Sequence, residues 1–294
     1  EVLRGPQGTL FGRNTSGGAV NFIPKRPDQD FYASAELSYG NYDAIDGRLV
    51  VNGGLTDSLA GRLSLSRREH SGFSENIETG AELDDEDNWS VRGQLLFTPS
   101  DSSRLLLGYD YVKDDTEGHA RVPFPVFDTG QAGANGLALA ALRAIWPAGS
   151  DVRKSYSVPE SFQEREINGL TARYENDASY GSWTVLGGWR NVELSWLEDL
   201  DGLKPFGFPP VTPPFPQPYG WVLKNRDEAD EYAEQYSLEV RLTSPADARV
   251  FWVGGLYYFT ETVERTESFL TQFSLVPVAG GDVTFVQDVD SESD

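Results

Sequence analysis

Short segments in which apolar and polar side chains alternate recur along most of the chain, and they constrain its fold more than any other feature. The clearest, 59–68, sets four small or apolar residues against four polar ones: Leu59, Gly61, Leu63 and Leu65 against Arg62, Ser64, Ser66 and Arg68. A period of two indicates β-strands with one apolar and one polar face. Nine strands are predicted in this way, at 32–40, 44–53, 59–68, 89–97, 103–111, 168–176, 183–197, 235–243 and 249–263.

The connections between these strands fall into two classes. Turns near 54–58, 98–102, 177–182 and 244–248 are short, whereas the connections at 69–88, 112–166 and 199–234 are long. Short turns at one end and long loops at the other are typical of outer-membrane β-barrels, whose strands of about 9–11 residues cross the membrane. A short helix is predicted within one long connection, at 137–146, and the acidic stretch 282–294 is predicted to begin another loop.

The two faces of the predicted sheet differ in chemistry. We expect the apolar face, with Leu63, Leu65, Leu95, Leu107, Leu238 and Val240, to contact lipid. The opposite face would line the lumen and carry Arg62, Arg92, Arg104, Arg173, Glu239 and Arg241. The strand pattern alone leaves a soluble β-sandwich as an alternative, but such rows of arginine favour the barrel. Nine is an odd number, and single-chain bacterial barrels have even numbers, so an incomplete sheet is expected.

Composition narrows the possible functions. The chain has no Cys, which excludes disulfides, thiolate metal sites and a cysteine nucleophile. Its net charge of -22 argues against nucleic-acid binding. No run of 18 apolar residues is present, which excludes a transmembrane helix but not a transmembrane barrel.

No catalytic site and no cofactor is predicted. The two histidines, His70 and His119, lie in predicted loops, and no phosphate-binding motif follows Gly8 or Gly12. The acidic run 84–87 is expected to be a solvated loop, with calcium binding as the alternative.

The first 27 residues differ from the rest, since glycines are interleaved with short apolar pieces. Such a pattern indicates short strands and tight turns packed inside another structure. Four motifs resemble the end of the plug domain of TonB-dependent outer-membrane receptors. They are Arg4-Gly5-Pro6-Gln7-Gly8, Gly12-Arg13-Asn14, Gly17-Gly18-Ala19-Val20-Asn21 and Lys25-Arg26-Pro27.

The resemblance implies an all-β fold in two parts. Residues 1–27 would end a plug, and residues 28–294 would be the N-terminal part of an antiparallel barrel of about 22 strands. It implies active uptake of a scarce ligand, such as a ferric siderophore, a cobalamin or an oligosaccharide, across the outer membrane of a Gram-negative bacterium. The TonB complex would supply energy through a segment outside this chain. The alternatives are a passive porin or adhesin, which has no use for the plug motif, and a soluble secreted carbohydrate-active protein.

Two sets of residues are candidates for binding roles. A loop rich in proline and aromatic residues is expected to contact the ligand through Phe206, Phe208, Phe215, Tyr219 and Trp221, because aromatic side chains give large contact areas. The alternative is a packed lid that only shields the mouth of the barrel. Arg4 and Arg13 are expected to hold the plug in the lumen by pairing with acids such as Glu36, Asp110, Glu175 or Glu239.

Overall fold

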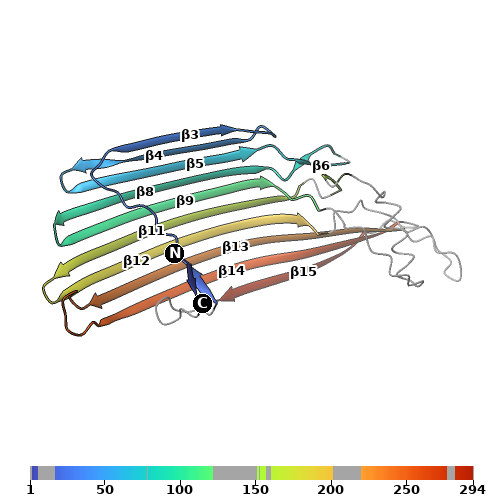
Figure 1. Ribbon diagram of the computed structural model, residues 1–294. Helices are drawn as coiled ribbons and strands as arrows, with labels where there is room; N and C mark the ends of the chain where they lie inside the picture. The colour runs from blue at the N-terminus through green and yellow to red at the C-terminus, as the bar shows by residue number, and fades with distance from the viewer. Residues whose placement is uncertain are drawn as a thin grey trace.

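One antiparallel sheet of ten strands forms the main body of the protein (Figure 1). The computed structural model describes residues 2–5, 17–77, 79–121, 151, 153–156, 160–200, 220–276 and 282–293. The strands of the sheet, in spatial order, are β3 (Tyr32–Tyr39), β4 (Ile45–Thr56), β5 (Leu59–His70), β8 (Glu86–Ser100), β9 (Ser103–Glu117), β11 (Phe162–Ala178), β12 (Gly181–Asp199), β13 (Gly220–Thr243), β14 (Val253–Val276) and β15 (Asp282–Ser293). The described residues contain no helix long and apolar enough to cross a membrane.

The predicted antiparallel all-β fold is confirmed, and all nine predicted strands are present. Several predictions about loops were wrong. Strands β5, β8, β9 and β11 extend into the predicted long connections, at 69–70, 86–88, 112–117 and 162–166, so half of the acidic run 84–87 belongs to a strand. Residues 282–293 form a tenth strand, β15, that pairs with β14, and residues 220–234 belong to β13 instead of a loop. With ten strands, the odd count no longer argues for an incomplete sheet. The helix predicted at 137–146 lies outside the described residues.

The register of the strands separates two faces of opposite chemistry. On one face, here named the apolar face, Leu63, Gly93, Tyr109, Leu170, Trp189 and Tyr236 lie side by side across six strands. The same face carries Leu65, Leu95, Leu107, Leu238 and Val240. The opposite, polar face carries a row of Asn52, Arg62, Gln94, Gly108, Thr171, Gly188 and Ser237.

The sheet is a single layer without a conventional core. Among the described residues, the buried hydrophobic side chains are Ala60, Leu83 and Ala229. On the apolar face, Leu107 is 43% exposed and Leu170 is 50% exposed. A continuous exposed apolar surface of this kind needs an apolar medium or partner to cover it.

Two small sheets accompany the ten-stranded sheet. At the end with long connections, β6 (Ser74–Asn76), β7 (Glu82–Leu83) and β10 (Lys154–Ser155) form a three-stranded sheet. Near the N-terminus, β1 (Val2–Arg4) pairs with β2 (Gly18–Val20). Gly18 has φ 142°, and a Cβ there would lie 2.5 Å from the carbonyl oxygen of Leu3, so this close pairing requires glycine.

Candidate functional site

The chain between β2 and β3 crosses the polar face of the sheet before it enters β3 (Figure 1). We name residues 21–31 the crossing segment. Asn52 of β4, which is 1% exposed, holds one end of it. The Asn52 side-chain amide donates to the Asp28 carboxylate and to the Asp30 carbonyl, each at 2.8 Å, and its oxygen accepts from the Asp28 backbone N–H at 3.4 Å. The hydrogen bond from Asn52 lowers the pKa of Asp28 below its ordinary value, which keeps this carboxylate charged.

An ion pair holds the crossing segment at a second point, on a strand distant from β4. The Arg26 guanidinium donates to both carboxylate oxygens of Glu175 on β11, at 2.8 and 3.3 Å. Glu175 also accepts from Arg173 Nε at 2.8 Å, and Arg104 Nε lies 3.9 Å from it. Between β4 and β11 in the sheet lie β5, β8 and β9, so the two contacts fix the segment across five strands.

Further ion pairs run across the polar face. Asp110 on β9 lies between Arg92, 4.0 Å away, and Arg190, 3.3 Å away. Gly169 on β11 is in register with both Asp110 and Arg190, and a Cβ at Gly169 would lie 2.8 Å from the Asp110 carboxylate. The glycine therefore leaves the space through which Asp110 reaches across β11 to Arg190.

Aromatic side chains mark one border of the apolar face. Tyr109 donates to Asn168 at 2.9 Å, and Trp189 and Tyr236 both donate to Glu234 at 2.9 Å. Asn168 and Glu234 lie in one row across the sheet. The next row toward the long connections carries charged residues on the same face: Arg67, Lys113, Glu166 and Glu193. Aromatic rings with their polar atoms directed at a charged border are typical of a membrane interface.

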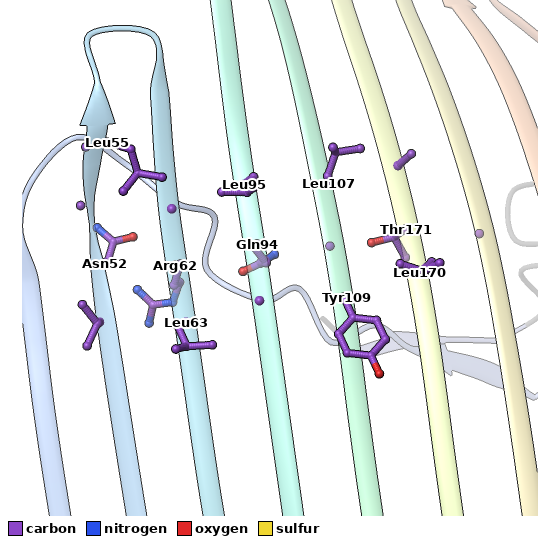
Figure 2. A pocket seen from close by; sticks show the side chains of 18 of the residues that line it. Asn52, Leu55, Arg62, Leu63, Gln94, Leu95, Leu107, Tyr109, Leu170 and Thr171 are labelled. Carbon is purple, nitrogen blue, oxygen red and sulfur yellow. The ribbon is translucent and has the colours of Figure 1, made fainter.

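A hollow of ≈1080 Å³ lies over the apolar part of the sheet (Figure 2). Leu63, Leu95, Leu107, Tyr109 and Leu170 line it, with glycines such as Gly93 and Gly187 between them. No atom lies within 4 Å of a Cβ added at Gly93 or Gly187, so the hollow is open space above small residues. Its lining is predominantly apolar, and an open apolar hollow on an exposed sheet face is suited to contact apolar chains.

Acidic residues gather at the end of the sheet with long connections. Burial raises the pKa of Asp85, whose carboxylate accepts from the Glu117 backbone N–H at 2.6 Å. Asp84 lies 3.4 Å from the His119 ring. Within the described part of the chain, no group of three or more acidic, His or Cys residues is arranged to hold a metal ion.

The structure places only some of the predicted site residues. Of the plug-like motifs it describes Arg4, Gly5, Gly17, Gly18 and Asn21, whereas Pro6, Gly8, Gly12, Arg13 and Asn14 lie outside the described residues. Phe206, Phe208, Phe215 and Tyr219 also lie outside them. Trp221, expected in the same loop, is in β13 and pairs in register with Leu275, so its assignment to a loop was wrong.

The predicted polar-face residues lie together on one face. Arg104 pairs with Asp177 at 3.0 Å, Arg241 donates to Glu239 at 2.7 Å, and Arg173 donates to Glu175. Sequence reasoning missed the roles of Arg26 and Asn52. The Lys25-Arg26-Pro27 motif indicated that Arg26 has a role, but no local pattern pairs Arg26 with Glu175, an acid 149 residues away.

Sequence comparisons relate the chain to several named receptors. No family model matches the chain. The catecholate siderophore receptor Fiu of Escherichia coli K12 is 26% identical over 181 residues, which cover 60% of this chain and 22% of Fiu. The pesticin receptor of Yersinia pestis is 32% identical over 83 residues, covering 28% and 12% of the two chains. The ferrioxamine receptor of Yersinia enterocolitica is 27% identical over 124 residues, covering 42% and 16%.

Solved structures of such receptors share the fold. The open form of Fiu from E. coli K12 matches with a TM-score of 0.58 at 15% identity, covering 99% of this chain and 55% of that one. BauA, the ferric preacinetobactin receptor of Acinetobacter baumannii, matches with a TM-score of 0.59 at 13% identity, covering 97% and 38%.

The chain thus spans between 12% and 22% of the length of these curated relatives, and all of them are named as receptors. Its N-terminal motifs, its antiparallel sheet with one exposed apolar face and these relatives point the same way: the chain is similar to TonB-dependent outer-membrane receptors and shares the fold of their solved structures.

Proposed function

We propose that this chain is part of an outer-membrane receptor that imports an iron-loaded siderophore with energy supplied through the TonB complex. The carrying observation is that the crossing segment is held against the polar face by Asn52 and Arg26, while the apolar face is left exposed. A segment bound to the polar side of a lipid-facing sheet is what a plugged barrel requires. The relatives named as siderophore receptors support siderophores over the other ligand classes considered.

In this proposal the polar face lines the lumen and the apolar face contacts lipid. Arg62, Arg92, Arg104, Arg173, Glu239 and Arg241 would then face water or the plug, where charged side chains stay hydrated or paired. Residues 1–27 would be the end of the plug and residues 28–294 the beginning of the barrel, with Arg4 and Arg13 holding the plug in place. Phe206, Phe208, Phe215 and Tyr219 would meet the ligand outside.

The alternative of a passive porin is less well supported. A passive pore needs an open lumen, whereas the crossing segment here occupies the polar face between β4 and β11. No described residue is proposed to have a catalytic role.

Uptake by the full-length receptor tests the proposal. The receptor would be produced in a Gram-negative strain that lacks its own siderophore receptors, and uptake of radioactive iron would be measured from ferric catecholates, hydroxamates and phenolates. We expect uptake from at least one class, and its loss when TonB is inactivated. Uptake that persists without TonB would support the passive pore, and no uptake from any class would contradict the siderophore assignment.

A further inference from the structure

A cavity of ≈400 Å³ lies between the crossing segment and the polar face. Pro24 and Lys25 cover it from the segment, and side chains of β4, β5, β8 and β9 form its wall. Its basic residues come from three adjacent strands: Arg48 from β4, Arg62 from β5 and Arg92 from β8. With Lys25 this gives four basic residues, against a single acid, Asp110.

Arg62 lacks a neutralising partner in this cavity. Its register neighbours on the polar face are Asn52 and Gln94, which are uncharged and lie beside it in Figure 2. The Asn52 amide is already directed to Asp28 and Asp30 of the crossing segment. Arg62 Nη1 is buried and has no hydrogen-bond partner among the described residues. A buried guanidinium nitrogen without an acceptor is costly, and a bound acceptor would remove that cost.

The neighbouring cations add to this unbalanced charge. Arg92 pairs in register with Ser64, so it is a diagonal neighbour of Arg62 on the same face, and like charges this close repel. Its one acid, Asp110, is 4.0 Å away and is shared with Arg190 at 3.3 Å. Arg48 lies 3.9 Å from Asp46 on its own strand and is in register with Glu36 of β3, and both of these acids lie outside the cavity. The cavity therefore holds more positive charge than its own acids neutralise.

The floor of the cavity is small and hydroxylated. Ser64, Ser66 and Ser90 lie there, and the Ser66 and Ser90 hydroxyls are 2.7 Å apart. Short hydroxyl side chains leave room between the arginines and can donate hydrogen bonds of their own. Guanidinium groups around hydroxyls provide the donors that bind carboxylate and phosphate oxygens.

We propose that this cavity is a binding site for a small oxyanion, carrying carboxylate or phosphate oxygens, that Arg62 and Arg92 hold against the serine floor. The site lies on the barrel wall beneath the crossing segment, away from the acidic end with long connections, where the ligand is expected to be recognised. Binding of an oxyanion at this site does not depend on which ligand the receptor imports. Its test is therefore separate from the uptake assay, because either can fail alone.

Calorimetric titration of the purified full-length receptor in detergent, at low chloride, tests the site with citrate as the probe. We expect saturable binding at one site, weakened about tenfold to a hundredfold by Arg62→Gln, because a charge-assisted hydrogen bond is lost. Arg48→Gln serves as a second variant with the same direction of effect in case Arg62→Gln fails to fold. The matched control is Arg241→Gln, which removes the same charge from the same face at a position outside the cavity, where Arg241 pairs with Glu239.

The outcomes separate clearly. Weaker citrate binding in Arg62→Gln or Arg48→Gln, with Arg241→Gln within twofold of the wild type, supports the site. Absence of saturable binding by the wild type overturns the proposal. Equal weakening by all three variants also overturns it, because the effect would then follow net charge alone.

Discussion

Replacing Glu175 by Gln should loosen the crossing segment without unfolding the sheet. The change keeps the shape of the side chain but removes the charge that Arg26 contacts at 2.8 and 3.3 Å. Hydrogen bonds to charged groups contribute about 1.5–3 kcal/mol. The Arg26 side chain is 39% exposed, so solvent screening reduces the loss to about 1–2 kcal/mol.

A loss of this size should raise the population of the detached segment about 5–30-fold. The segment keeps its second contact, at Asn52, so the effect should be confined to the residues near Arg26. Hydrogen exchange of the full-length receptor, followed on peptides that cover residues 21–31, measures this population. Glu239→Gln is the matched control, because it removes the partner of Arg241 on the same face and leaves the segment's contacts intact. Exchange at the wild-type rate in Glu175→Gln, or an equal increase in the control, would refute the reasoning.

Three other substitutions probe the remaining features. Leu107→Arg on the apolar face should destabilise the inserted barrel by about 2–4 kcal/mol, whereas Leu106→Arg on the polar face should be tolerated. Heat-modifiable gel mobility of the receptor in outer membranes measures the folded fraction. An equal loss of folded receptor in both variants would contradict the assignment of faces. Gly169→Ala should lower the unfolding temperature, because the new Cβ displaces Asp110 from Arg190. Gly187→Ala should leave the unfolding temperature unchanged, because the space around its Cβ is open. Equal changes of the unfolding temperature in both variants would show that the space at Gly169 is unimportant. Asn52→Leu should increase hydrogen exchange at residues 28–30, because the Asp30 carbonyl and the Asp28 carboxylate lose their donor; unchanged exchange there would contradict the anchoring role.

Alternation predicted the strands only where one side of the sheet is apolar. In β5, Leu63 and Leu65 alternate with Arg62 and Ser64, and the prediction of a strand is confirmed. In β13, by contrast, residues 226–231 carry acids or arginine on both faces, so the pattern of a half-buried strand disappears although the backbone pairing continues. β15 was missed for another reason: Val283, Phe285 and Val289 do alternate with Asp282, Asp288 and Asp290, but the acidic composition of the stretch indicated a loop.

The contacts of the crossing segment could not be predicted for a different reason. Glu175 is one of many acids on the polar face, and only the three-dimensional path of residues 21–31 brings Arg26 to it. Asn52 likewise looks like any polar residue of an alternating strand. Its role depends on burial under the segment, which no local pattern encodes.

Strand β13 extends far beyond the aromatic border of the apolar face. From Glu234, beside the aromatic border, the strand continues for 14 residues to Gly220, roughly 48 Å at about 3.4 Å per residue. Arg265 on β14 stiffens this ribbon, because it pairs with Glu231 on β13 at 3.4 Å and its guanidinium lies 4.9 Å from the centre of the Trp196 ring on β12. In the proposed receptor, the far end of this paired ribbon would stand well beyond the lipid headgroups, within reach of molecules too bulky to approach the bilayer.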